Sequence, residues 1–192
     1  MDLFEDFLRK YPPADSLRKP AASQLEQYRG ILPNALLEFW REYGFGNYGD
    51  GLLKVIDPAG YRNSLSRWLG GENLNRLPIL MTAFGDLLYY RKLSETEDDV
   101  CLLDIHYRRI ITCSYSFAGL FTDFVADDAV RAELLRAELF HEAAEAEGPL
   151  EENEIFFFAP ALALGGSETV NCISKGDAAA HHQLLFEMGA ST

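Results

Sequence analysis

Residues 78–113 hold four short apolar runs separated by turn residues, and this pattern constrains the fold more than any other feature of the chain. The runs pair across two turns, Gly85-Asp86 and residues 106–108, and the first is a two-residue hairpin turn that begins with glycine. The predicted strands are Ile79–Phe84, Leu87–Lys92, Val100–Ile105 and Arg109–Cys113, with a further strand at Leu52–Ile56. The sequence therefore predicts an antiparallel meander of four or five strands.

Helical spacing of apolar residues precedes and follows this meander. The clearest case runs from Pro33, at a first-turn position, through Leu36, Trp40 and Tyr43 to a stop at Gly44. Further helices are expected at residues 3–11, 23–30 (opened by a Ser23–Glu26 capping box), 60–69, 117–124, 128–139 and 178–188, with short strands at 155–158 and 169–173.

This order predicts an α+β protein with N-terminal helices, an antiparallel strand meander, and C-terminal helices with a short mixed end. We expect two parts, residues 1–115 and a companion part at residues 116–192, packed as one globular unit. The N-terminus has acids where a signal peptide needs basic residues, and no run approaches 18 apolar residues. The expected location is therefore the cytoplasm, with Cys101, Cys113 and Cys172 as buried, reduced thiols.

Negative charge is concentrated in the second half of the chain. Residues 1–92 carry 12 Lys/Arg against 11 Asp/Glu, whereas residues 93–192 carry 5 against 19. Most of the excess acids lie between Leu93 and Glu154. Such a surface repels nucleic acid and anionic membranes and attracts basic partners. The near-neutral first half is expected to serve mainly as scaffold.

Catalytic patterns are weak throughout. The glycine loop at residues 44–51 follows a helix and precedes a strand, whereas a phosphate cradle needs the order strand, loop, helix, so turn glycines with positive φ are the better interpretation. His106, His141, His181 and His182 lack the spacing of zinc ligands and are interpreted as surface or half-buried structural residues. No G-x-S-x-G motif is present, and the paired acids lie in polar runs typical of solvated side chains.

Two segments resemble a known family. Residues 32–44 (Leu-Pro, then an amphipathic helix) and the following glycine loop and strand, up to Asp57-Pro58, resemble the start of the GAD-like domain and the wider SUKH immunity superfamily. Residues 154–166, including Pro160-Ala-Leu-Ala-Leu-Gly-Gly166, and the terminal helix resemble the domain that accompanies it. The combination is similar to immunity proteins paired with type VI secretion DNase toxins.

The resemblance implies a non-enzymatic inhibitor, without cofactor or metal, that binds a basic nuclease and blocks its active site or DNA groove. An acidic surface complements such a groove and speeds encounter. The expected partner-binding residues are Glu95, Glu97, Asp98, Asp99, Asp127, Asp128, Glu145, Glu147, Glu151 and Glu152.

Tight binding also needs an apolar or aromatic anchor, for which Tyr107 and Phe140 are candidates, although each is more often a core residue. Two alternatives remain open at this point. One is an acidic adaptor or DNA-mimic regulator of another basic protein, and the other is a metal-dependent hydrolase that uses the clustered acids.

Overall fold

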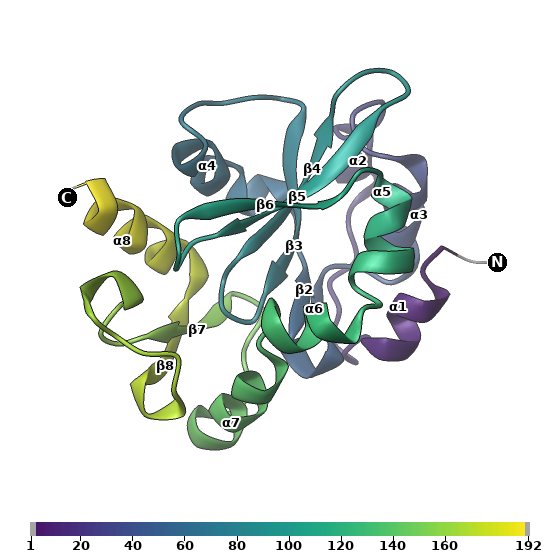
Figure 1. Cartoon of the computed structure of the whole chain (residues 1–192). Coiled ribbons are helices and arrows are strands. Elements are labelled where there is room, and N and C mark those ends of the chain that lie inside the picture. Colours follow the sequence, from purple (N-terminus) through teal and green to yellow (C-terminus); the bar gives the residue numbers. More distant parts are fainter. Residues whose placement is uncertain (1–2, 191–192) are drawn as a thin grey trace.

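A single antiparallel sheet forms the centre of the computed structural model, which describes residues 3–190. Its strands follow one another in chain order, β1 to β6, each paired with the next (Figure 1). They are β1 (Gly46–Tyr48), β2 (Leu53–Val55), β3 (Arg76–Thr82), β4 (Leu87–Lys92), β5 (Asp98–Asp104) and β6 (Arg109–Ser114). Most consecutive residues of β3, β4 and β5 are buried. Since neighbouring residues of a strand point to opposite faces, the sheet is covered on both sides.

One face of the sheet packs against the N-terminal helices and the segment that follows β6. These elements are α1 (Glu5–Lys10), α2 (Ala22–Glu26), α3 (Asn34–Glu42), α5 (Phe117–Gly119) and the π-helical turn η2 (Leu120–Phe124). Phe7 lies at the centre of an aromatic cluster, with ring centroids 6.0 Å from Phe39 and 5.3 Å from Phe121. The main core therefore joins the first forty residues to a segment more than a hundred residues later.

The other face of the sheet packs against α4 (Pro58–Trp68) and α8 (Ala178–Ala190), on the left in Figure 1. Leu65 of α4 lies in a second core cluster with Met81, Tyr89 and Leu103, which point to this face. Asp57 caps α4 by accepting a hydrogen bond from the Ala59 amide, with Pro58 at the first helical position.

The second half continues below the sheet. It contains α6 (Asp128–Glu133), α7 (Ala137–Glu147) and a two-stranded antiparallel sheet of β7 (Glu154–Phe158) and β8 (Ile173–Asp177). The short 3₁₀ turns η3 (Leu162–Leu164) and η4 (Val170–Cys172) lie between β7 and β8, and a third, η1 (Gly49–Gly51), lies between β1 and β2. The Phe156 amide donates to the Ala83 carbonyl at 2.8 Å, which fixes the small sheet to the β3–β4 connection. None of the helices in the described residues is long and apolar enough to cross a membrane.

The predicted α+β class and the antiparallel meander are confirmed. Two details of the sheet differ from the prediction. β1 is an additional strand within the predicted glycine loop, although Gly44, Gly46, Gly49 and Gly51 do have positive φ as expected. The β3–β4 connection spans residues 83–86 rather than two residues, because the Thr82 amide bonds the Asp86 carbonyl.

Several predicted boundaries in the helical parts are wrong. The helix expected over 128–139 is broken at Arg136, whose φ of 53° lies in the left-handed region. The capping box at Ser23 does not form, since α2 begins at Ala22 and the Gln24 side chain accepts from the Ala21 amide. The strand expected over 169–173 is a 3₁₀ turn followed by β8. The division at residues 115/116 stays a prediction; the central sheet ends one residue before it, at Ser114.

Candidate partner-binding surface

The ten acids predicted to bind a partner lie in three separate places. Four belong to the β4–β5 turn and the start of β5, two to the start of α6, and four to the end of α7 and the loop after it. Figure 1 shows the β4–β5 turn at the top of the molecule and α7 at the bottom, so these acids do not form one continuous patch.

The group at β5 is used largely inside the protein. Asp99 is only 4% exposed, and its two carboxylate oxygens accept hydrogen bonds from Arg91 at 2.7 and 2.5 Å. Asp98 accepts from the Tyr90 hydroxyl and from the Phe117 amide. The expectation that paired acids are solvated is therefore wrong here, because these carboxylates fix β5 to β4 and to α5. Glu97 is exposed, and Glu95 pairs with Lys92 at 3.0 Å.

The group at α6 has local structural roles. Asp127 caps the helix by accepting from the Ala129 amide at 2.7 Å. Asp128 is exposed and pairs with Lys10 of α1 at 2.6 Å, which lowers the pKa of its carboxyl group. Asp127 and Asp128 are both exposed, so they stay candidates for contact with a partner.

The third group presents four exposed carboxylates within eight residues. We call residues 145–152 the acidic segment; its acids are Glu145, Glu147, Glu151 and Glu152. The first two lie in the last turn of α7, where no basic side chain is present. Negative charge at a helix C-terminus opposes the helix dipole, at about 0.3–1 kcal/mol per charge. The sequence thus keeps acids at a position where local stability disfavours them.

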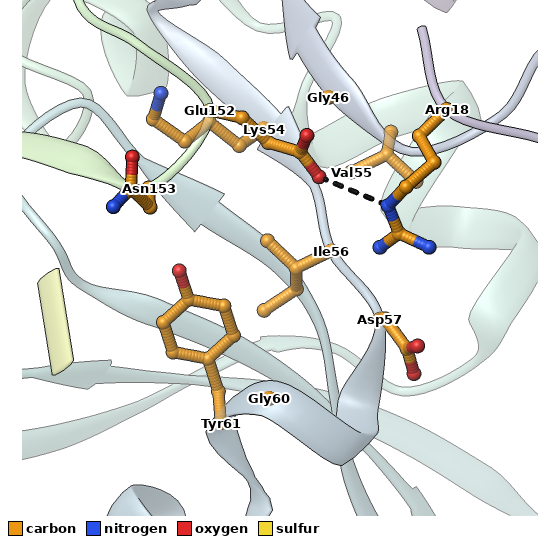
Figure 2. Close-up of a pocket in the computed structure, with 10 residues that line it drawn as sticks. All are labelled: Arg18, Gly46, Lys54, Val55, Ile56, Asp57, Gly60, Tyr61, Glu152 and Asn153. Carbon is orange, nitrogen blue, oxygen red and sulfur yellow. Dashed lines mark hydrogen bonds and ion pairs between the residues drawn. The ribbon is translucent and has the colours of Figure 1, made fainter.

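A cavity of about 290 Å³ lies beside the acidic segment. Figure 2 shows the Arg18–Glu152 ion pair on one side of the cavity and the Tyr61 ring on the other. The Arg18 Nε to Glu152 Oε1 distance is 3.4 Å. The cavity therefore lies where the loop before β7 meets β2 and the start of α4. Its charged lining residues are Arg18, Lys54 and Asp57 from the first half of the chain and Glu152 from the second.

Lys54 places a fully buried ammonium group in the wall of this cavity. Its Nζ donates to Asn47 Oδ1 at 2.6 Å and to the Glu151 carbonyl at 2.8 Å. Burial lowers the pKa of Lys54 to about 8, and the nearby carboxylates of Glu154, Glu152 and Glu151 limit that decrease. Lys54 thus holds the backbone of the acidic segment against β2.

A second buried charge cluster joins the two halves at the β3–β4 turn. Asp86, with no exposed side-chain surface, accepts from Arg136 Nη1 at 2.8 Å and from the Ile105 amide at 3.0 Å. Arg136 also bonds Glu168, and its guanidinium stacks on the Phe84 ring. Burial lowers the pKa of Arg136, but the facing carboxylates outweigh that effect, so the net pKa is raised. We call Asp86, Arg136 and Glu168 the clasp, because their contacts join the β3–β4 turn to the second half of the chain.

Two histidines contact the backbone of the same β3–β4 turn. His106 Nε2 lies 2.8 Å from the Phe84 carbonyl, and His182 Nε2 lies 2.7 Å from the Gly85 carbonyl. Both are buried, so the prediction of surface or half-buried histidines is wrong for them, whereas His181 is half-buried and His141 exposed. Within the described residues no group of three or more His, Cys, Asp or Glu side chains could hold a metal ion.

The predictions for the cysteines and for the two aromatic anchor candidates are each correct only in part. All three cysteines are free, but only Cys101 is buried. Phe140 is 2% exposed and belongs to the core, so it is wrong as an anchor candidate, while Tyr107 is 51% exposed and remains one.

Sequence reasoning missed Lys54, Asp86 and Arg136. The signal for Lys54 was available: it stands between the apolar residues of a short predicted strand, where a buried cation needs partners.

Two known protein families match parts of this chain. Residues 2–101 match the GAD-like domain family, and residues 115–189 match the family described as T6SS immunity protein Tdi1, C-terminal. The chain belongs to the GAD-like family. No curated protein matches it. Among solved structures, the crystal structure of Atu4351 from Agrobacterium tumefaciens is similar with a TM-score of 0.73 at 18% identity, covering 95% of this chain and 88% of the other. At that identity the likeness concerns the fold.

Proposed function

We propose that this GAD-like protein is an inhibitor that binds a type VI secretion toxin with DNase activity and blocks it without chemistry of its own. The match of residues 115–189 to the Tdi1 C-terminal family supports an immunity protein of type VI secretion, and it is the observation that carries the proposal. The GAD-like match over residues 2–101 supports the same assignment for the rest of the chain, as the sequence resemblance implied.

Charge supports a nuclease as the target. A nuclease must hold phosphates, so its DNA groove is basic. The chain carries a net charge of −13, and the acidic segment offers four exposed carboxylates on a backbone held by Lys54. Since a fixed, complementary charge raises association rates and its effect falls with salt, this segment is suited to meeting a basic groove quickly.

The buried ionic groups support a role without catalysis. Asp99, Asp86 and Arg136 are each bound to partners in the fold, and their contacts hold strands and turns together. The proposed site of action is the cytoplasm, because a DNase must be stopped where the chromosome lies.

The test is complex formation with the proposed partner, a type VI secretion toxin whose gene is sought next to the gene for this chain. We expect a stable complex, and reversal of Glu151 and Glu152 to Lys should slow association at least tenfold at low salt and flatten its salt dependence. The matched control is a double reversal of Glu5 and Glu38, two exposed acids on α1 and α3. No complex with the wild-type chain would contradict the proposed function; equal association rates for the two double variants would exclude the acidic segment as the contact.

A further inference from the structure

The two edges of the central sheet are treated differently. Residues 13–18 lie along β1, where the Ala14 amide donates to the Asn47 carbonyl at 3.0 Å and the Arg18 amide to the Phe45 carbonyl at 2.8 Å. At the opposite edge, the backbone of β6 pairs with β5 and with no other strand or segment among residues 3–190. One edge is therefore covered and the other is open.

The open edge carries a β-bulge at Cys113, where the register with β5 shifts, but residues 109–112 pair with β5 in regular register and have little further protection against pairing. β6 reads Arg109-Ile-Ile-Thr-Cys-Ser114, without proline or lysine. Its single charge, Arg109, is directed to Asp104 at 3.0 Å. Ile110 is 54% exposed, and Thr112 is exposed as well. An edge with four residues in regular register, an exposed isoleucine and no backbone partner beyond β5 among residues 3–190 is a template for another strand, which soluble proteins normally block.

A cavity of about 460 Å³ continues this edge at its C-terminal end. Tyr115, 88% exposed, stands at the rim, and Phe124 and Val130 supply apolar surface. Asp123 and Asp127 are the charged residues of the lining, and both are exposed. A lining of mixed polar and apolar residues, with two carboxylates and no cation, suits the aliphatic stem and positive head of a Lys or Arg side chain.

We propose that an extended segment of the toxin adds a strand along β6 and places a Lys or Arg side chain between Asp123 and Asp127. This proposal rests on the proposed function and specifies its interface. A basic partner is favoured over a second copy of this chain, because two chains of net charge −13 repel each other and the cavity carries only negative charge. Backbone pairing provides affinity along the edge, and the cavity selects the register.

Hydrogen exchange in the presence of the purified candidate toxin tests whether a strand is added along β6. In the complex, the outward-facing amides of β6 should gain at least tenfold protection, whereas the covered edge at β1 should not change. In parallel, Asp123→Lys should weaken toxin binding about tenfold or more, as expected for close charge pairs across an interface. The matched control is Glu38→Lys, an exposed acid on α3, which should change affinity less than twofold.

The outcomes separate the two proposals. If the wild-type chain does not bind the toxin, the proposed function fails. If it binds and inhibits, but β6 amides stay unprotected and Asp123→Lys binds as well as Glu38→Lys, the strand-addition proposal is overturned and the proposed function stands. Protection of β6 in a dimer without toxin, measured by sedimentation and exchange, would assign the edge to a second copy and also overturn the proposal. Because Asp123 is exposed, its substitution should leave the fold intact, and thermal melting of the variant verifies this.

Discussion

Burial of His182 should make the protein lose stability as the pH falls from 7.5 to 5. The side chain is 1% exposed on the face of α8 that meets the β3–β4 turn, and Nε2 bonds the Gly85 carbonyl. Burial is the main cause that lowers the pKa of His182 to about 4, from 6.5 for the free side chain. The folded protein therefore holds this imidazole neutral at a pH where the unfolded chain protonates it.

The difference in proton binding between the folded and unfolded chain gives the sign and size of the change in unfolding free energy. Between pH 6.5 and 4 the unfolded chain binds more protons at this site, so the contribution is complete above pH 6.5 and is lost as the pH falls towards 4. At pH 5 the loss is about 2 kcal/mol, and below pH 4 it approaches about 3 kcal/mol, at 1.36 kcal/mol per pKa unit. That is a large fraction of the ~5–15 kcal/mol typical of a folded domain.

Urea unfolding followed by tryptophan fluorescence at pH 7.5 and 5.0 measures the effect. His182→Gln keeps an N–H donor for the Gly85 carbonyl but cannot titrate, so it should lose about 2 kcal/mol less than the wild type between these pH values. His141→Gln, at an exposed position of α7, is the matched control and should behave as wild type. If His182→Gln and wild type lose the same stability, the imidazole is not held neutral by burial and the reasoning is refuted.

Two further predictions concern the same turn. Arg136→Met should cost about 3–5 kcal/mol because it leaves the Asp86 carboxylate buried without its cation, and adding Asp86→Asn should recover part of that loss; a cost below about 1 kcal/mol in urea unfolding would contradict the clasp. Gly85→Ala should destabilise well beyond Gly30→Ala: both have positive φ, a conformation that costs about 1–2 kcal/mol for other residues, but only at Gly85 would the new Cβ lie 2.6 Å from the Ile155 side chain. Equal melting temperatures for the two alanine variants would show that the turn can relax.

The central sheet was predictable because its signals are local. Short apolar runs separated by turn residues mark β3 to β6 directly in the sequence. Pro33 and Gly44 likewise mark the two ends of α3 to within about one residue. β1 escaped because three residues among glycines carry no period, and the strand forms only by pairing with β2 and with residues 13–18. The break at Arg136 escaped for a similar reason, since its left-handed backbone is fixed by Asp86, fifty residues earlier.

The acids show the limit of charge counting. Composition identified an acidic second half, but Asp99 and Glu152 look alike in sequence while one is buried against Arg91 and the other lines an open cavity. Which carboxylates face solvent depends on strand register and loop packing. The open β6 edge was also beyond sequence reasoning, because an edge strand is defined by the absence of a neighbour in space.

Inhibition of the toxin is the most direct test of the account. The proposed partner, a type VI secretion toxin with DNase activity, is mixed with plasmid DNA and increasing amounts of the purified protein, and cleavage is followed on gels. Cleavage should stop when the protein reaches about one molecule per toxin molecule. If the toxin still cuts DNA at its full rate with the protein in excess, the assignment as its immunity protein is contradicted.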